Sequence, residues 1–354
     1  MKVVVTGGGT GGHIFPAISI GEEILRRDLK NEVLFIGTKS GLEGKIITSR
    51  GYTIRFIDSI GLMGEGFSRK VVGTFMAAKG TAQSVRILRE FRPDVVLGVG
   101  GYASGPALLA ARLLGIPTAI CEQNTIPGVT NRILGRFVKR VFAAFEENLR
   151  YFPRRKTLLV GNPTRSELLK VQSNHINRDG FRILILGGSQ GAHRINLTVP
   201  KAISALGRSD VSVIHQTGER DLEEVKKTYE WFGVSAQVYS FIEDMSWAYR
   251  AADIVVGRAG AGTVAEITAL GKPALLIPYP FAAYNHQREN ARILERAGAA
   301  VVIDDKDLFP EKVADVLGKL LTYDRLEKMA EQAKRLGKPN AAKEIVDELY
   351  RLAG

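Results

Sequence analysis

The residues best suited to binding or catalysis lie near the start of the chain, where a short apolar run leads into a glycine turn. The stretch VVVTGGGTGGHIFPA places this turn, Gly7 to Gly12, directly before His13. Glycines allow backbone N–H groups and a helix N-terminus to come close to a phosphate. An imidazole titrates near neutrality, so His13 fits a general base or a donor that orients substrate oxygens. A structural hydrogen bond at a helix start is the third alternative for His13.

Two common cofactor loops fit this turn poorly. A triphosphate loop requires Lys and then Ser or Thr after its last glycine, whereas this chain has His13 and Ile14. The glycines match the dinucleotide pattern formally, but the second predicted strand ends VLFIGT, without an acid for the ribose. An NAD-dependent oxidoreductase is therefore disfavoured.

The second half of the chain holds a better candidate for a nucleotide site. The segment GGSQG would place Ser189 and helix amides against a diphosphate. The segment GRAGAGTVAE adds a cation in Arg258, a hydroxyl in Thr263 and a carboxylate in Glu266. Because a carboxylate accepts several hydrogen bonds, Glu266 is a candidate for both ribose hydroxyls, with a solvated helix residue as the alternative.

The acidic residues do not indicate a metal site. No Asp-x-Asp pair follows a predicted strand, and the acids of VVIDDKD are predicted to lie in a solvated loop. We therefore expect no cofactor and no metal held by the protein, although a free divalent cation could assist. The helix N-termini that follow the glycine turns, together with Arg258, could neutralise a bound diphosphate.

The elements that must position these residues alternate between strand and helix. Such alternation predicts an α/β protein with parallel sheets. The pattern VVVTGGGTGGH is echoed by ILILGGSQGAH, which favours two doubly wound, Rossmann-like domains facing a cleft. We predict a first domain over 1–162, a second over 163–339 and a C-terminal helix over 340–354 that packs back on the first. The predicted strands are 3–5, 33–36, 95–99, 118–121, 141–143, 183–186, 211–215, 254–256 and 274–278.

Composition restricts the class of protein further. The length of 354 residues suits two domains, and one cysteine, Cys121, suits a reducing cytoplasm. No basic-then-apolar leader opens the chain, so we expect no secretory signal. Residues 1–160 hold 23 Lys and Arg against 12 Asp and Glu, whereas residues 161–354 hold 26 against 25. The basic first half favours an anionic substrate or lipid surface over nucleic acid, since no stacking set of aromatics is interleaved with it.

Eight motifs occur together in an order that resembles one enzyme family. They are GGTGGHIFPA, GVGGYASGP, CEQNTIPGVTNR, VGNPTR, GGSQGA, FIEDM, RAGAGTVAE and NHQRENA. They are similar to the MurG family, the UDP-N-acetylglucosamine–N-acetylmuramyl-(pentapeptide) pyrophosphoryl-undecaprenol N-acetylglucosamine transferases. The resemblance implies a GT-B enzyme that inverts the anomeric carbon while converting lipid I to lipid II for peptidoglycan. It also implies a peripheral protein at the cytoplasmic face of the bacterial inner membrane.

The resemblance also implies roles for individual residues. His13 would act at the reacting centre, and Arg258 is carried over with the donor site. Ile242 would contact uracil through its backbone, Glu266 the ribose, and Gln287 the sugar hydroxyls. The full set implied for UDP-N-acetylglucosamine is Thr10, Gly11, Gly12, Asn124, Arg165, Ser189, Ile242, Arg258, Ala261, Gly262, Thr263, Val264, Ala265, Glu266 and Gln287. Gly262 stands where a larger apolar residue is usual, so that position would act through its backbone.

An apolar run beside basic residues marks a candidate membrane face in the first half. Its apolar members are Leu62, Met63, Phe67, Val71, Val72, Phe75 and Met76, and its basic neighbours are Arg69, Lys70, Lys79 and Arg86. Such a patch could hold the protein on anionic lipid, with an ordinary core helix as the alternative. The loop GLMGEGFSRK carries Met63 and Glu65 where the family is more basic. Other functions left open are a UDP-N-acetylglucosamine 2-epimerase, a lipid glucosyltransferase and a non-catalytic binder of sugar nucleotides or nucleic acid. The oligomeric state is unknown.

Overall fold

The computed structural model describes the chain except residues 10, 40, 42, 60–66, 171–179 and 188–191, and for residues 67–72 it describes the backbone alone. The chain divides into two compact units. Unit 1 comprises Met1–Ser166 and Lys338–Gly354, and unit 2 comprises Glu167–Gly337. The sequence predicts a boundary after residue 162, and the structure places it after Ser166.

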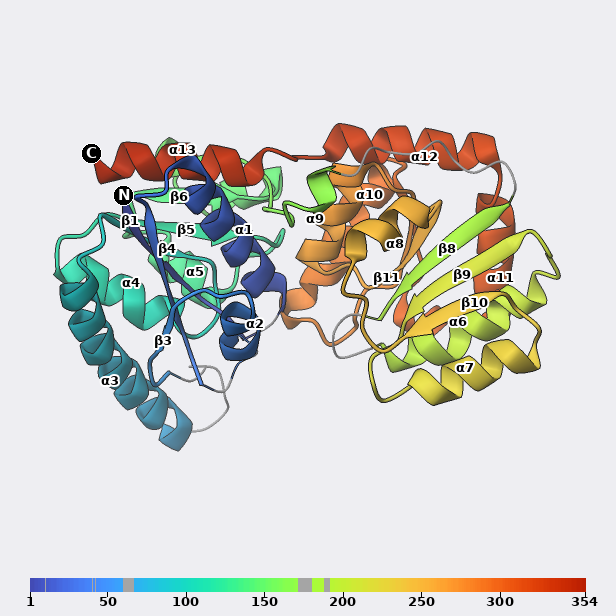
Figure 1. Cartoon of the computed structure of the whole chain (residues 1–354), viewed down its shortest axis with the longest axis horizontal. Coiled ribbons are helices and arrows are strands. Elements are labelled where there is room, and N and C mark those ends of the chain that lie inside the picture. The colour runs from blue at the N-terminus through green and yellow to red at the C-terminus, as the bar shows by residue number, and fades with distance from the viewer. Residues whose placement is uncertain (10, 40, 42, 60–66, 171–179, 188–191) are drawn as a thin grey trace. The chain divides into compact units, whose positions relative to one another are not determined.

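Unit 1 is built on a parallel sheet with the strand order β3-β2-β1-β4-β5-β6-β7 (Figure 1). Its interior strand β1 pairs with β2 and β4, so that Val3 lies opposite both Val33 and Val95. The strands are β1 Lys2–Thr6, β2 Glu32–Gly37, β3 Ile54–Phe56, β4 Val95–Gly98, β5 Thr118–Glu122, β6 Arg140–Ala143 and β7 Thr157–Leu159. The helices are α1 Gly11–Arg27, α2 Glu43–Ser49, α3 Phe67–Phe91, α4 Ser104–Leu113, α5 Val129–Leu134 and α13 Ala341–Ala353, with short 3₁₀ turns η1 Glu146–Arg150 and η2 Arg154–Lys156.

Helices cover both faces of this sheet, which is why its strands are apolar on both sides. Val3 and Val5 pack into a cluster with α1 and α13, whereas Val4 faces a second cluster with α3 and α4. All three valines are buried. The alternation of the two clusters along β1 is the expected consequence of the two-residue period of a strand.

The C-terminal helix α13 lies on α1 and completes one of these layers. Its apolar stripe of Ile345, Val346 and Leu349 is buried in the same cluster as Val3. At its surface Arg27 donates to Asp347 at 2.5 Å, and Arg140 donates to Glu348 at 3.1 Å. The tail therefore belongs structurally to the unit that contains the start of the chain.

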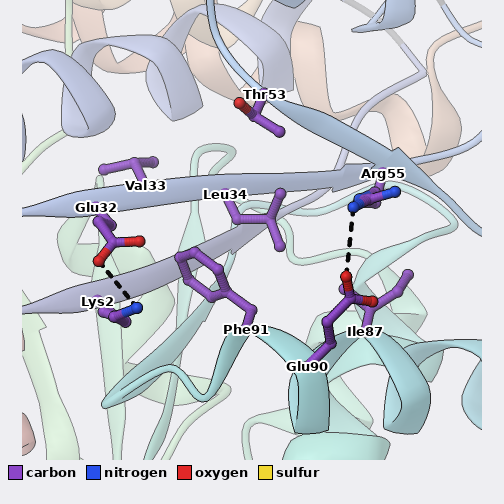
Figure 2. Close-up of a pocket in the computed structure, with 9 residues that line it drawn as sticks. All are labelled: Lys2, Glu32, Val33, Leu34, Thr53, Arg55, Ile87, Glu90 and Phe91. Carbon is purple, nitrogen blue, oxygen red and sulfur yellow. Dashed lines mark ion pairs between the residues drawn. The ribbon is translucent and has the colours of Figure 1, made fainter.

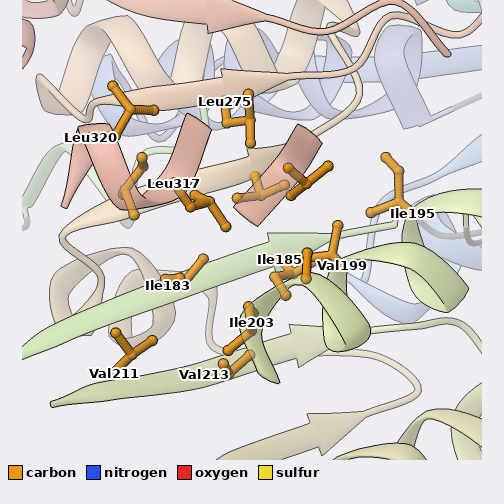
Figure 3. Close-up of a cluster of buried hydrophobic side chains, with 14 of the residues drawn as sticks. Ile183, Ile185, Ile195, Val199, Ile203, Val211, Val213, Leu275, Leu317 and Leu320 are labelled. Atoms are coloured by element: carbon orange, nitrogen blue, oxygen red, sulfur yellow. The ribbon is translucent and has the colours of Figure 1, made fainter. Parts of the chain in front are cut away.

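Unit 2 repeats the plan with six parallel strands in the order β10-β9-β8-β11-β12-β13. Figure 3 shows its core, in which Ile183 and Ile185 of β8 lie between side chains of α6 and α11. The strands are β8 Phe181–Leu186, β9 Val211–Gln216, β10 Ala236–Tyr239, β11 Ile254–Gly257, β12 Ala274–Leu276 and β13 Ala300–Val302. The helices are α6 His193–Ala205, α7 Leu222–Trp231, α8 Met245–Ala251, α9 Ala261–Leu270, α10 His286–Arg296, α11 Pro310–Leu320 and α12 Tyr323–Leu336, with 3₁₀ turns η3 Leu168–Lys170, η4 Ala283–Asn285 and η5 Asp305–Asp307.

In both units the chemistry-bearing turns follow the carboxyl ends of parallel strands. The turn after β1 leads to His13, the turn after β5 leads to Asn124, and the turn after β11 leads to Ala261. Ligands of open α/β sheets bind at this edge, because the strand ends and helix N-termini converge there. The fold therefore places the predicted site residues where such a site belongs.

Candidate active site

The backbone amides of the first three glycines in the unit 1 turn donate hydrogen bonds to acceptors within the protein. Gly7 N donates to Ile36 O at 3.1 Å, Gly8 N to Gly100 O at 3.2 Å, and Gly9 N to a Glu43 carboxylate oxygen at 2.9 Å. An anion at this turn would therefore bind at the start of α1, from Gly11 onward, where the first amides have no acceptor within the helix. No acidic residue occurs in that first turn. Of the predicted contacts here, Thr10 lies outside the described residues.

A buried carboxylate beneath this turn escaped the sequence reasoning. Glu43, the first residue of α2, is 1% exposed and accepts hydrogen bonds from Thr38 N at 2.8 Å and Thr38 Oγ1 at 2.9 Å. The dinucleotide pattern requires an acid at the end of the second strand, where it binds a ribose. Glu43 lies beyond that strand end and supports the glycine turn instead.

The turn after β4 determines where the His13 side chain lies. A methyl group on Gly100 would come 2.7 Å from His13 Cε1, so the imidazole occupies the space that a side chain would need. Gly100 has a φ of +98° and its N–H donates to Ser104 Oγ at 3.2 Å. The motifs GGTGGH and GVGGYASGP are thus in contact, and the second positions the histidine of the first.

The turn after β5 is held from beneath by Glu122 and Gln123. Asn124 N donates to Glu122 Oε1 at 3.0 Å, and Gln123 Nε2 donates to Val99 O at 2.7 Å. Burial raises the pKa of the Glu122 carboxyl to about 7, against the opposing effect of its hydrogen-bond donors, which include Asn131 Nδ2 at 2.8 Å. Asn124 therefore sits on a rigid base with its side chain partly exposed.

Arg165 lies against the first helix of unit 1. Its guanidinium carbon is 4.1 Å from the centre of the Phe15 ring, a distance typical of a cation–π contact. Arg165 therefore packs on the first turns of α1, at Phe15, which lies two residues along the chain from His13. A contact of Arg165 with nucleotide stays a prediction.

In unit 2 the predicted phosphate cradle coincides with the N-terminal turns of α9. Gly260 is the N-cap, with φ −65° and ψ 149°, and the first turn carries no acid. A methyl group on Gly262 would meet nothing within 4 Å, so this part of the turn is open. The members of the predicted set on α9 are Ala261, Gly262, Thr263, Val264, Ala265 and Glu266.

Glu266 is a buried, oriented carboxylate. It is 8% exposed, and the hydroxyl of Tyr249 donates to its Oε2 at 2.9 Å. The alternative of a solvated helix residue is therefore wrong. Tyr249 belongs to α8, and sequence reasoning did not single it out, because nothing in the chain spacing joins it to α9.

Arg258 already has a counter-ion within the protein. Its Nη1 lies 2.6 Å from Asp305 Oδ1, and the other oxygen of Asp305 lies 2.7 Å from Arg194 Nη1. The prediction that VVIDDKD is a solvated loop is thus wrong for Asp305, which is 7% exposed. The physical reason is that β13 pairs with β12, which returns this segment to the neighbourhood of the turn after β11. A contact of Arg258 with diphosphate stays a prediction.

Two further predicted residues have their polar groups partly engaged. Ile242 N donates to Gln216 Oε1 at 2.9 Å, which leaves its carbonyl for a base. Gln287 Oε1 accepts from Tyr279 N at 2.9 Å, which directs its amide nitrogen elsewhere as a donor. Gln287 follows Tyr284 and Asn285, both with left-handed φ near +55°. Non-glycine residues in this conformation cost energy and cluster at ligand sites.

The segment GGSQG of unit 2 is followed by a histidine that is paired with an aspartate. Ser189, the predicted contact, lies outside the described residues, but α6 begins just beyond it at His193. His193 Nδ1 lies 3.0 Å from Asp221 Oδ1, and Asn196 Nδ2 donates to the other oxygen at 2.8 Å. The histidine of GGSQGAH was noted only as part of the internal echo, so this pair was missed.

One pocket lies away from these turns. Figure 2 shows it at the opposite, amino-terminal ends of β1 and β2, with a volume of about 390 Å³. Two ion pairs flank its apolar floor: Lys2 with Glu32 at 2.9 Å, and Arg55 with Glu90 at 3.6 Å. None of the predicted site residues lines it, so it is not part of the candidate active site.

The described residues contain neither a cluster of metal ligands nor a membrane-spanning helix. No group of three His, Cys, Asp or Glu side chains among them is arranged to hold a metal ion. No helix in the described parts of the chain is long and apolar enough to span a membrane.

The comparisons with known proteins agree with each other along the chain. The model of the glycosyltransferase family 28 N-terminal domain matches residues 3–143, and that of the C-terminal domain matches residues 182–345. A UDP-N-acetylglucosamine--N-acetylmuramyl-(pentapeptide) pyrophosphoryl-undecaprenol N-acetylglucosamine transferase from Syntrophus aciditrophicus is 48% identical, with 98% of this chain and 97% of the relative aligned. A Geobacter sulfurreducens protein of the same name is 47% identical over 99% and 98% of the two chains.

Solved structures give the same result for the fold. MurG from Acinetobacter baumannii matches with a TM-score of 0.81 and 32% identity, over 99% of both chains. A UDP-GlcNAc 2-epimerase from Neisseria meningitidis, solved with UDP-GlcNAc bound, matches with a TM-score of 0.68 over 99% of this chain and 100% of its own. At 18% identity, that second likeness shows a shared fold alone.

Proposed function

The chain belongs to the MurG family of UDP-N-acetylglucosamine--N-acetylmuramyl-(pentapeptide) pyrophosphoryl-undecaprenol N-acetylglucosamine transferases, and we propose that it catalyses the transfer which that name describes. It is a glycosyltransferase of GT-B architecture, as predicted. The donor is UDP-N-acetylglucosamine, the acceptor is lipid I, and the product is lipid II. The observation that carries the proposal is the near-full-length identity to relatives of this name, together with turns at the carboxyl ends of parallel strands in each unit.

Unit 2 is proposed to hold the donor. The amides at the start of α9 and the positive end of its dipole suit a diphosphate. Glu266 is fixed on the same helix by Tyr249 and offers a charged acceptor to the ribose. Gln287 presents its amide nitrogen as a donor for sugar hydroxyls, and Ile242 presents its carbonyl to the base.

Unit 1 is proposed to supply the base. In this mechanism His13 takes the proton of the acceptor hydroxyl while that oxygen attacks the anomeric carbon of the donor. The bond from this carbon to the UDP oxygen breaks on the opposite side, so the configuration inverts. Gly100 supports this role because it leaves room for the imidazole, which packs against its backbone.

We propose that no metal is held by the protein and that stabilisation of the leaving diphosphate falls to helix N-termini and nearby cations. A free divalent cation could add to this effect. Exhaustive treatment with a chelator should leave most of the turnover if the proposal is right, whereas complete loss that Mg²⁺ restores would make the cation obligatory.

The membrane-facing surface is proposed to lie on α3, α4 and α5. These helices pack in sequence against each other and expose Phe75, Leu109, Leu113 and Ile133, and Phe137 is exposed in the turn after α5. Arg112, Arg136 and Lys139 are exposed among them. Of the apolar run predicted earlier, only Phe75, exposed by 69%, and the half-buried Met76 have described side chains. Among its basic neighbours Lys79 pairs with Asp58 at 2.8 Å, and Arg86 is exposed.

Sedimentation with liposomes tests this surface. Each basic residue near anionic lipid contributes on the order of 1 kcal/mol, which salt weakens. Binding should therefore require anionic lipid and fall as salt is raised. Equal sedimentation with neutral liposomes at high salt would remove the electrostatic part of the proposal.

The function itself is tested by supplying both substrates to the purified protein. Incubation with UDP-N-acetylglucosamine and lipid I should yield lipid II, with the new linkage inverted relative to the donor. Release of an epimerised UDP-sugar without lipid II would favour a 2-epimerase. Nucleotide binding without any turnover would favour a non-catalytic binder.

A further inference from the structure

The contact between Tyr249 and Glu266 joins two helices that nothing in the sequence connects. Tyr249 is 0% exposed, and its hydroxyl donates to Glu266 Oε2 at 2.9 Å. A buried hydroxyl requires a partner, but it could satisfy itself on a backbone carbonyl. Here it is directed at the one carboxylate that α9 buries.

Tyr249 is held in place by both ends of its helix. At the start of α8, Asp244 Oδ1 accepts from Trp247 N at 3.0 Å and caps the helix. At its end, the buried Lys272 donates through Nζ to Ala252 O at 2.6 Å. Because α8 is fixed at both ends, the hydroxyl of Tyr249 is a rigid reference point for Glu266.

We propose that Tyr249 is a positioning residue that orients Glu266 and thereby sets the preference for a ribonucleotide over a 2′-deoxyribonucleotide donor. The inference rests on the proposed role of Glu266 as the ribose acceptor. A carboxylate has about four acceptor positions, of which the tyrosine uses one on Oε2. This bond holds Oε2 and limits the rotation of the carboxylate, which favours one orientation toward the ribose hydroxyls. Without it the carboxylate reorients and its advantage for a 2′-hydroxyl falls.

The test compares the dissociation constants of UDP and 2′-deoxy-UDP by calorimetry. In the Tyr249→Phe variant, the constant for UDP should rise about three- to ten-fold, since a hydrogen bond of this kind has a modest net effect. The constant for 2′-deoxy-UDP should rise by a smaller factor, because only its 3′-hydroxyl meets the carboxylate. The preference for ribose therefore shrinks. In steady-state assays, the donor KM should rise and kcat should stay within about two-fold, because the tyrosine acts on binding alone.

Tyr229→Phe is the matched control in the same unit. Tyr229 is also buried, at 2% exposed, and its hydroxyl lies 3.0 Å from His215 Nδ1, away from Glu266. Its loss should lower the unfolding midpoint without changing the preference for ribose. Both nucleotides are measured on the same preparation, so any reduced folded fraction of Tyr249→Phe cancels from the ratio.

Glu266→Ala, which removes the acceptor, separates failure of this inference from failure of the proposed function. If Glu266→Ala loses the preference for ribose and Tyr249→Phe retains it, Tyr249 is a structural residue and the inference is overturned. If Glu266→Ala itself retains the preference, the ribose assignment of Glu266 fails first. If both variants lose the preference and Tyr229→Phe retains it, the positioning role stands.

Discussion

The turn after β1 in unit 1 and the turn after β11 in unit 2 are both rich in glycine, yet they are built in opposite ways. In the first, Gly7, Gly8 and Gly9 all have positive φ, and their amides are bonded to Ile36, Gly100 and Glu43. In the second, Gly262 meets open space and no glycine of the turn has positive φ. The glycine amides of the first turn are bonded within the protein, whereas the second turn has open space beside Gly262.

The difference shows that glycine content alone does not identify a phosphate site. In unit 1 the glycines are required because the turn after β1 packs closely against the turn after β4 at Gly100. His13 then follows at a fixed position. In unit 2 the glycines keep the start of α9 uncovered. The same residue type thus fixes the place of the His13 side chain in one unit and leaves open space at a helix start in the other.

The largest expected effect breaks the closed turn. In Gly7→Ala the new methyl group would overlap Gly100 O, and φ at this residue is +152°. Backbone strain and overpacking each cost about 1–3 kcal/mol, so unit 1 should lose about 2–6 kcal/mol of stability. Denaturant unfolding measures the loss, and an unchanged midpoint would show that the turn is not closed as described.

The two units also differ in how a buried titratable group in each responds to pH. Burial raises the pKa of Glu122 in unit 1 to about 7 and lowers the pKa of His215 in unit 2 to about 3, the latter despite the opposing charge of Asp221. Glu122 is charged in the unfolded chain above about pH 4.5, so its contribution to stability falls as pH rises from there to 7. His215 is charged in the unfolded chain below about pH 6.5, so its contribution falls as pH drops towards 3.

Between pH 5 and 7 each group should shift stability by about 2 kcal/mol, with opposite signs. The measurement is the unfolding free energy at several pH values for the wild type, Glu122→Gln and His215→Gln. The wild-type advantage over His215→Gln should rise with pH, and that over Glu122→Gln should fall. Hydrogen exchange assigns each change to its unit. Parallel pH profiles for the three proteins would contradict the assigned burial effects.

The smallest expected effect is in the open turn. Gly262→Ala adds a methyl group into empty space in the first turn of α9 and lowers the entropy of the unfolded chain. Unit 2 should gain up to about 1 kcal/mol, measured as in Gly7→Ala. A loss comparable to that of Gly7→Ala would mean that the two turns are alike after all.

Most of the fold could be predicted from the sequence, and the strands that were missed share one property. All nine predicted strands are present, whereas β3, β7, β10 and β13 were not predicted. These four lie at the edges of the two sheets. An edge strand is covered on fewer sides, so it lacks the continuous apolar run that marks a central strand. In β10, for example, no residue is fully buried, and half-buried residues alternate with exposed ones.

The candidate site was predictable only where its residues belong to contiguous motifs. His13 and Glu266 were found because each stands in a glycine-rich segment. Glu43, Tyr249 and Asp305 were not, because their roles depend on contacts with distant parts of the chain. Asp305 in particular reaches Arg258 through the pairing of β12 with β13, which spacing along the chain does not reveal.

The central claim is that unit 1 carries the chemistry and unit 2 the donor, and one paired measurement tests it. Calorimetry gives the dissociation constant of the donor, and single-turnover rates at saturating donor give the chemical step, for His13→Ala and Glu266→Ala. His13→Ala should lower the rate by roughly 10²–10⁴-fold while the dissociation constant stays within about two-fold. Glu266→Ala should raise the dissociation constant by about 5–150-fold, equivalent to about 1–3 kcal/mol, and largely retain the rate. If both variants changed the same parameter, or if His13→Ala lost only a few-fold in rate, the division between the two units would be wrong.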